Sequence, residues 1–283
     1  MADMKKTVNK TTKNNFITYG MVIAIFAVVQ ILSSTGNLSR LLTGLLVPIC
    51  VYTIASLSLN LVVGYSGELS LGHAGFMCVG AYSSAVFSHV TSDLIPSVPR
   101  LILAILVGAV VAAVFGVLIG IPVLRLRGDY LAIVTLAFGE IIKNLINVLY
   151  VGMDSNGFHF SIKDTTSLGM GADGVVIIKG AQGITGTPKA ATFTVGIILV
   201  LITLFIVLNL INSRTGRAIM SIRDNRIAAE SVGINITKYK LMAFAISAAL
   251  AGVAGVLYAH NLSSLAATPK NFGYNMSIMI LVF

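Results

Sequence analysis

Charge is what this sequence lacks most. Only 10% of its 283 residues are Asp, Glu, Lys or Arg, while 56% are hydrophobic. Soluble domains carry roughly 25% charged residues, and a water-exposed surface cannot be built from so few. Most of the chain must therefore have a lipid bilayer as its solvent. We expect an all-α membrane protein, a polytopic bundle of transmembrane helices in the cytoplasmic membrane.

Acidic residues, tryptophan and cysteine are also scarce. Ten Asp and Glu stand against 19 Lys and Arg, which gives a formal charge of +9. The basic residues fall between apolar stretches and not on one soluble face, which argues against nucleic-acid binding. Tryptophan is absent, so tyrosine must supply most of the aromatic belt. The two cysteines, Cys50 and Cys78, lie inside apolar runs and are read as buried packing residues.

Several motifs for chemistry are missing as well. There is no G-x-x-x-x-G-K-[ST] loop, so the chain cannot bind and split ATP by that route. The four histidines are scattered without metal-ligand spacing, so we expect no metal site. No Ser-His-Asp arrangement is suggested by position. We therefore expect a non-catalytic chain without a cofactor, and any energy for pumping must come from a partner subunit or an ion gradient.

Apolar runs long enough to cross a bilayer as helices recur along the chain. In lipid a helix is the only open-ended structure that satisfies its own backbone hydrogen bonds. An eighth run begins near Asn275 and is cut off at Phe283. We expect about eight spans, of which the complete ones are residues 16–32, 41–63, 71–90, 101–124, 130–150, 191–211 and 241–262.

The distribution of Lys and Arg predicts the orientation, because cytoplasmic loops are enriched in both. With the N-terminus inside, segments 1–15, 64–70, 125–129 and 212–240 are cytoplasmic and hold twelve of the 19 basic residues, against six outside. Residues 1–15 are then a cytoplasmic tail and 151–189 a Gly-rich external loop. A loop this long is usually functional or disordered, and we expect an ordered lid or docking surface.

Small residues recur at four-residue spacing in two of the expected spans. One stripe consists of Gly108, Ala112, Gly116 and Gly120, and a second of Ala251, Gly255 and Ala259. Such stripes let helix backbones approach closely in lipid. We expect both to pack inside the bundle.

The segment 212–240 is too apolar for a solvated connector and too short and charged to span. Asp224 suits a helix N-cap, and Gly233 suits the position just past a helix end. Two interpretations stand side by side. The segment docks into a cytoplasmic partner, or it is a basic amphipathic helix that rests on anionic lipid.

Two further polar features lie within or between spans. Glu140 and Lys143 are three residues apart on one helix face, and a lone charge near the middle of a span costs at least ~2.5–3.5 kcal/mol. They form either a polar element of a transport path or a structural ion pair. Residues 64–73, GYSGELSLGH, are too rich in glycine for a continuous helix. They form either a break that lines a cavity or an ordinary turn.

Three long blocks of the sequence carry a family resemblance. They are SLNLVVGYSGELSLGHAGFMCVGAYSSA (58–85), LRGDYLAIVTLAFGEIIK (126–143) and SRTGRAIMSIRDNRIAAESVGINITKYKLMAFAISAALAGVAGVLYA (213–259). They resemble the LivM-type permeases of branched-chain amino acid ABC importers, and the likeness runs from about Leu41 to the C-terminus. Similar chains continue past the position of Phe283, so this chain is expected to be incomplete there.

The resemblance implies an importer permease domain over residues 16–283 in a bacterial cell membrane, moving Leu, Ile and Val. It implies a LivH-type second permease, two cytoplasmic ATPases that use ATP and Mg²⁺, and an external solute-binding protein. Expected ATPase-coupling residues are Arg217, Arg223, Asp224, Arg226, Glu230 and Gly233. Candidate path residues are Tyr65, Glu68, His73 and Glu140.

Two alternatives to this function stay open. Related permeases move other small solutes, so the cargo could be a sugar, a nucleoside or urea. A self-sufficient secondary transporter driven by an ion gradient, with Glu140 titrating, is the second alternative.

Overall fold

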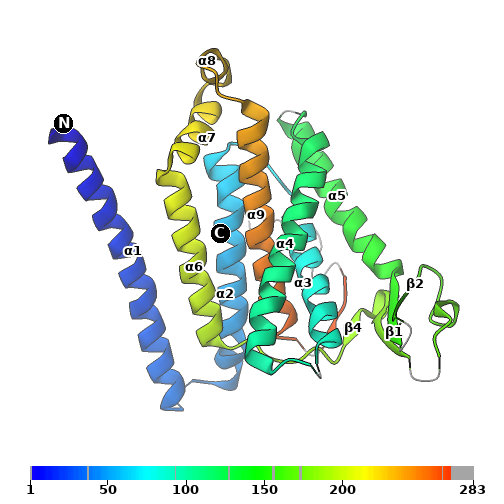
Figure 1. Cartoon of the computed structure of the whole chain (residues 1–283). Helices are drawn as coiled ribbons and strands as arrows, with labels where there is room; N and C mark the ends of the chain where they lie inside the picture. The colour runs from blue at the N-terminus through cyan, green and yellow to red at the C-terminus, as the bar shows by residue number, and fades with distance from the viewer. Residues whose placement is uncertain are drawn as a thin grey trace.

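The computed structural model describes residues 2–268 except 37, 93, 127, 155–156, 172–173 and 263, and it gives only the backbone for residues 2–12 and 14. Helices account for most of this part of the chain (Figure 1). They are α1 (Ala2–Ser34), α2 (Arg40–Asn60) with a π-helical turn (Leu61–Tyr65), α3 (His73–Val90), α4 (Ser97–Val123), α5 (Asp129–Val148), α6 (Phe193–Asn212), α7 (Arg214–Asp224), α8 (Arg226–Ser231) and α9 (Ile236–Ala259).

Helix α9 lies at the centre of the bundle, where small residues let three helices meet. A Cβ added to Gly80 of α3 would lie 2.5 Å from the Cα of Gly252 in α9. A Cβ on Gly252 would in turn lie 2.5 Å from the Cβ of Ala112 and 2.8 Å from the carbonyl oxygen of Gly108, both in α4. Backbones can approach this closely only without larger side chains. The prediction that the two stripes pack inside the bundle is confirmed.

Six of the described helices are long and apolar enough to cross a membrane: Asn15–Ser34, Arg40–Tyr65, Ser97–Val123, Asp129–Val148, Phe193–Asn212 and Ile236–Ala259. The predicted count of about eight is therefore not reproduced. The predicted third span corresponds to α3, which is less apolar than these six. The predicted eighth run, from Asn275, lies outside the described residues.

Helix α3 is less apolar because it is surrounded by protein. Thirteen of its eighteen residues are buried, among them the polar His73, Ser84 and Ser88. A helix enclosed by other helices does not need a lipid-compatible surface, and its polar side chains find partners inside the bundle. Ser88, for example, is hydrogen-bonded to His260 at 2.8 Å.

A small sheet at one end of the bundle corrects the all-α prediction. Its strands are β1 (Tyr150–Asp154), β2 (Gly157–Ser161), β3 (Val175–Lys179), β4 (Ile184–Thr185) and β5 (Ser264–Leu265). They are antiparallel in the order β2-β1-β3-β4-β5. The β-branched run of β3 is a strand signal that the glycine-rich composition of 151–189 obscured.

The sheet is attached to the helices and is not a slack linker. The Tyr82 hydroxyl of α3 donates to the carbonyl oxygen of Leu265 in β5 at 3.1 Å, and Ile184 and Leu265 are fully buried. The described residues of segment 151–189 thus form strands and 3₁₀ turns, as expected of an ordered segment, while its role as a lid or docking surface stays a prediction. The sheet lies at one end of the bundle and α7 and α8 lie at the other (Figure 1).

Candidate functional site

Between α2 and α3 the chain leaves helical geometry within the bundle. The π-helical turn ends at Tyr65, and residues 66–72 are not helical until α3 begins. The amide of Leu71 donates to the Thr135 side-chain oxygen of α5 at 3.0 Å. Backbone outside a helix is tolerated at membrane depth where protein satisfies it or where it lines a cavity. The prediction that residues 64–73 do not form a continuous helix is confirmed, while the choice between a break that lines a cavity and an ordinary turn stays open. We call residues 61–72 the broken segment.

The first contact between the broken segment and α7 comes from Arg223. Its Nη1 donates to the carbonyl oxygen of Gly64 at 2.8 Å, while Nε and Nη2 donate to Asp224 Oδ1 at 3.1 and 3.0 Å. The stem of Arg223 lies over Gly67, where a Cβ would be only 2.6 Å from the arginine Cγ. Gly67 also has a φ of +70°, a region that favours glycine. Both constraints explain a glycine at this position.

A second contact joins the broken segment to α9. Lys240 Nζ donates to Glu68 Oε1 in an ion pair whose side chains are 14% and 11% exposed. Removing one partner of a buried ion pair costs about 3–5 kcal/mol because the other charge is left uncompensated. The contacts Arg223–Gly64 and Glu68–Lys240, which we call the two ties, therefore connect the broken segment to the end of α7 and to the first turns of α9.

Segment 212–240 forms two short helices and not one. Ser213 caps α7 by accepting from the Gly216 amide at 3.1 Å, and Asn225 caps α8 by accepting from the Ala228 amide at 3.0 Å. The prediction that Asp224 is the N-cap is wrong by one residue, because Asp224 ends α7 and binds Arg223. Asparagine and aspartate are comparable caps, so composition alone could not separate the two.

The end of α8 follows the predicted glycine rule. The Gly233 amide donates to the backbone carbonyl of Glu230 at 3.0 Å, and the Ile234 amide donates to that of Ala229 at 3.1 Å. With a φ of +85° at Gly233, this is the Schellman pattern of helix termination. Ile234 then packs against the small cluster of Ile222, Ala229 and Ile236. The turn therefore fixes how α8 projects from the start of α9.

Around α8 the surface combines exposed apolar and charged side chains. Ile227 and Val232 are 81% and 75% exposed. The expected coupling residues Arg217, Arg223, Asp224, Glu230 and Gly233 are also exposed, and Arg226 is half-buried. The Arg217 guanidinium donates to the Asn212 carbonyl at the end of α6, at 3.1 Å. Exposed apolar residues rimmed by charges are typical of an interaction surface.

Within α5, Glu140 and Lys143 form an ion pair. The Lys143 side chain is 9% exposed, whereas that of Glu140 is 38% exposed. The pair lies near the start of α3, since a Cβ on Gly75 would be 3.0 Å from the Cα of Gly139. The two side chains are therefore paired, while the choice between a structural pair and an element of a transport path stays open, and the carboxylate remains accessible.

Sequence analysis overlooked two asparagines on the same helix. Asn144 and Asn147 follow Glu140 at spacings that share one face of α5. Asn147 Nδ2 donates to the Ala267 carbonyl at 2.9 Å, and its buried Oδ1 has no hydrogen-bond partner among the described residues. A helical-wheel projection of 129–148 would have shown this polar face, which consists of Glu140, Lys143, Asn144 and Asn147.

The four candidate path residues do not form one cluster. His73 is 2% exposed and hydrogen-bonded to Ser58 of α2 at 2.6 Å, so it joins two helices inside the core. Glu68 is held by Lys240 and Glu140 by Lys143, so the two carboxylates belong to separate ion pairs. Tyr65 is half-buried at the end of the π-helical turn. Of the four, Glu140 keeps its charge accessible at mid-helix.

The part of the chain that the structure describes contains neither a cluster of metal ligands nor a pair of bonded cysteines. It holds no group of three His, Cys, Asp or Glu that could bind a metal. Cys50 and Cys78 are free and buried, as expected of packing residues.

Comparison with known proteins places the chain in a family. The family described as branched-chain amino acid transport system / permease component matches residues 41–283. The high-affinity branched-chain amino acid transport system permease protein LivM of Salmonella typhimurium is 36% identical over 241 residues, which are 82% of this chain and 55% of that protein. LivM of Escherichia coli has the same identity and coverage. The chain thus spans about half the length of these relatives.

A more distant relative carries a different name. The nucleoside ABC transporter permease protein NupC of Lactococcus lactis is 25% identical over 197 residues, which are 70% of this chain and 60% of that protein. No solved structure matches the chain. Because the family match covers most of the chain, the protein belongs to the permease components of branched-chain amino acid transport systems.

Proposed function

We propose that this chain is the transmembrane permease subunit of an ABC importer that moves the branched-chain amino acids Leu, Ile and Val across the cytoplasmic membrane. The observation that carries the proposal is the 36% identity to LivM over 82% of the chain. The chain itself is non-catalytic, and partner ATPases use ATP and Mg²⁺. A LivH-type second permease and an external solute-binding protein complete the assembly.

In this proposal the N-terminus and segment 212–240 are cytoplasmic, and α7 and α8 dock into an ATPase. Ile227 and Val232 supply apolar contacts, and Arg217, Arg226 and Glu230 supply charged ones. Two features favour docking of this segment into an ATPase over an orientation in which it lies on the lipid surface. Ile227 lies on the six-residue helix α8 and Val232 directly follows it, beyond the start of α9 (Figure 1). Acidic Glu230 beside them would be repelled by anionic lipid.

The two ties would carry the ATPase's movement into the membrane. A shift of α7 pulls on the Gly64 carbonyl through Arg223, and a shift of the start of α9 pulls on Glu68 through Lys240. π-Helical turns occur frequently at functional sites, and this one leads directly into the non-helical residues 66–72. The broken segment is then the element with two arrangements that such coupling requires.

The polar face of α5 would form one wall of the path, facing the second permease. An amino acid is a zwitterion, and neither of its charges enters a bilayer without a partner. The accessible Glu140 carboxylate would receive the substrate ammonium, and Lys143, thereby released from its partner, would receive the carboxylate. Both groups are already paired with each other, so the empty path leaves no uncompensated charge.

Uptake of radiolabelled leucine by cells that depend on this importer tests the proposal. Glu230→Pro breaks α8 and should abolish uptake while membrane insertion, followed by cell fractionation, is unchanged. Ser231→Pro, at the exposed last residue of the same helix, should act in the same way. Glu230→Ala keeps the helix and removes only the charge, so it should lose less uptake than Glu230→Pro. Normal uptake by both proline variants would reject the coupling role.

A nucleoside importer is the second candidate, favoured by the similarity to NupC. An excess of unlabelled uridine or adenosine should leave leucine uptake unchanged if the cargo is an amino acid. Competition by the nucleosides, together with none by Ile and Val, would change the substrate class and keep the importer architecture.

A further inference from the structure

The two ties end at the broken segment, but the charged groups of the proposed path lie on α5. The first tie runs from the broken segment to α7 and the second runs to α9, so neither includes a residue of α5. A movement of the broken segment reaches Glu140 and Lys143 only if that segment is also held to α5. The described part of the chain contains such a bond, in which the amide of Leu71 donates to Thr135 Oγ1 at 3.0 Å.

Both hydrogen-bonding functions of the Thr135 hydroxyl are in use. Thr135 is 2% exposed, and its hydroxyl accepts from the Leu71 amide while it donates to the Ala132 carbonyl of its own helix at 2.9 Å. A hydroxyl can donate and accept at once, whereas an apolar side chain of the same shape can do neither. Leu71 lies outside a helix, so the loss of this acceptor would leave a part-buried amide unpaired, which costs free energy.

Three glycines extend this bond into a backbone contact between α5 and the start of α3. A Cβ on Gly72 would lie 2.1 Å from the Thr135 carbonyl oxygen, and a Cβ on Gly75 would lie 3.0 Å from the Cα of Gly139. A Cβ on Gly139 would in turn lie 3.4 Å from the Cα of Gly72. Close-packed backbones transmit a displacement with little loss. Because Glu140 directly follows Gly139, a displacement at this turn of α5 also moves the Glu140 carboxylate.

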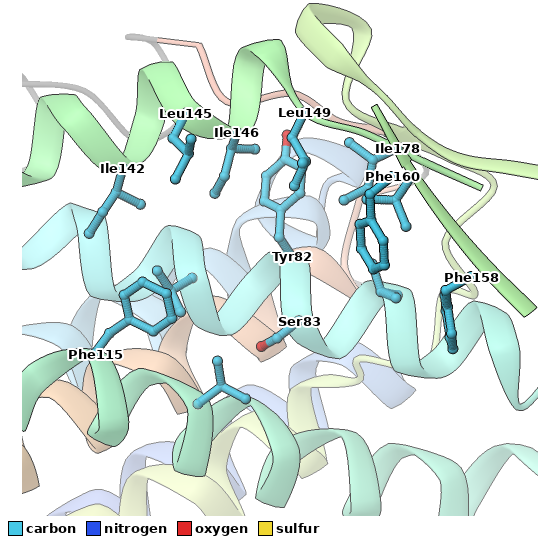
Figure 2. Close-up of a pocket in the computed structure, with 14 residues that line it drawn as sticks. Tyr82, Ser83, Phe115, Ile142, Leu145, Ile146, Leu149, Phe158, Phe160 and Ile178 are labelled. Atoms are coloured by element: carbon cyan, nitrogen blue, oxygen red, sulfur yellow. The ribbon is translucent and has the colours of Figure 1, made fainter. Parts of the chain in front are cut away.

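Beyond this contact α5 diverges from α4 toward the sheet (Figure 1). Figure 2 shows the apolar groove between them, which has a volume of about 380 Å³ and is lined by side chains such as Tyr82, Phe115 and Ile146. The far end of α5 is attached again, because Asn147 Nδ2 donates to the Ala267 carbonyl at 2.9 Å. The polar face lies between the two attachments. A displacement at the first attachment therefore tilts this part of α5 about the second.

We propose that Thr135 is a positioning residue for transport, which carries the movement of the broken segment to the polar face of α5. The inference rests on the proposed function and extends its coupling route. The movement passes from α7 through the first tie to the broken segment, from the Leu71 amide to Thr135, and along α5 to Glu140 and Lys143. Thr135 acts through the position of α5 and not by binding the substrate. The route is a chain of hydrogen bonds and backbone contacts with one element that has two arrangements, as such coupling requires.

The number of leucine molecules imported per ATP hydrolysed, measured in proteoliposomes with the complete assembly, tests the role of Thr135. Thr135→Val keeps the shape of the side chain and removes the hydroxyl. Hydrolysis should persist while leucine import falls several-fold, so the ratio falls several-fold. Thr135→Ser restores the hydroxyl and should restore the ratio. Thr135→Ala repeats the test if the valine variant does not assemble.

The ratio separates a positioning role from a merely structural one. A variant that only lowers the amount of folded complex reduces import and hydrolysis together and leaves the ratio unchanged, which would overturn the proposal. Thr53→Val is the matched control, because the Thr53 hydroxyl donates to the Ile49 carbonyl of its own helix α2 at 2.8 Å. Its ratio should equal that of the wild type. Absence of ATP-dependent import by the wild type would reject the proposed function itself, whereas an unchanged ratio in Thr135→Val rejects only this inference.

A distance measurement gives an independent readout of the movement. Spin labels on cysteines placed at the exposed positions Ile141 of α5 and Leu118 of α4 report the separation of the two helices, and the two native cysteines are buried. ATP binding to the assembly should change this separation in the wild-type background and leave it unchanged in Thr135→Val. No change in the wild-type background, or the same change in both, would overturn the proposal.

Discussion

The two ion pairs Glu68–Lys240 and Glu140–Lys143 have the same chemistry in two different settings. The first joins residues 172 positions apart, and both its side chains are nearly buried. The second lies within one helix, and its carboxylate is 38% exposed. Breaking the first releases two elements of the fold from each other, whereas opening the second leaves the helix intact. The long-range pair is suited to hold the broken segment to α9, and the local pair is suited to exchange partners with a charged ligand.

The largest effect is expected from Lys240→Met. This change leaves the Glu68 carboxylate buried without its partner, so the free energy of unfolding should fall by about 3–5 kcal/mol, and leucine uptake should be lost. Thermal unfolding in detergent measures the first effect and whole-cell uptake the second. Adding Glu68→Gln to the Lys240 variant should restore most of the stability. If the Lys240→Met protein were as stable as the wild type, the Glu68–Lys240 ion pair would not stabilise the fold.

A charge reversal sharpens the contrast at the local pair. Combining Glu140→Lys with Lys143→Glu keeps an ion pair on α5, so stability should change by less than about 1 kcal/mol. Leucine uptake should nevertheless fall at least tenfold, which corresponds to about 1.4 kcal/mol in the transport barrier, because both charges now face the wrong ends of the zwitterion. Ile141→Ala, on the lipid-facing side of the same turn, is the control. Unchanged uptake would make this pair merely structural.

Gly67→Ala tests the packing beneath Arg223. A left-handed backbone costs a residue with a Cβ about 1–2 kcal/mol, and here the Cβ would also press on the Arg223 stem. Gly169→Ala is the matched control, because Gly169 has a left-handed backbone with φ +61° and ψ +30° but nothing within 4 Å of its Cβ. Denaturation midpoints should drop for both variants and further for Gly67→Ala. An equal drop would show that the Arg223 contact adds nothing.

The smallest change in stability is expected from Arg223→Met. Its guanidinium is partly solvated, so the loss of the bond to Gly64 should reduce stability by less than about 1 kcal/mol. ATP hydrolysis by the partner subunits should persist while leucine uptake falls several-fold, because the first tie is cut. Arg214→Met, which removes another exposed arginine from the same helix, should leave both rates near wild type. Equal behaviour of the two variants would argue against the tie.

Local spacing predicted some of these features and could not have predicted others. The Glu140–Lys143 pair, the glycine-rich break and the Gly233 helix end all depend on residues a few positions apart. The Glu68–Lys240 pair depends on how α9 packs beside the broken segment, which no local pattern contains. For the same reason the sequence could not reveal that β5, which follows α9, completes a sheet that begins at Tyr150.

Other discrepancies come from treating lipid as the only solvent for a helix. Helix α3 is enclosed by protein, so its hydropathy falls below that of the six apolar helices although it is fully helical. Asn144 and Asn147 were overlooked because an apolar run was taken as uniform around its axis. His73, a candidate path residue because it ends the glycine-rich break, is hydrogen-bonded to Ser58 in the core. Burial, and not residue type, separates such structural polar groups from accessible ones.

ATP-dependent leucine uptake into proteoliposomes tests the central claim most directly. The vesicles contain either this chain alone or the chain with its second permease, its ATPases and the external binding protein. We predict uptake only with the complete assembly and ATP, and none when the chain carries Glu230→Pro. Leucine accumulation by the chain alone, driven by an imposed ion gradient, would contradict an ABC permease and establish a secondary transporter.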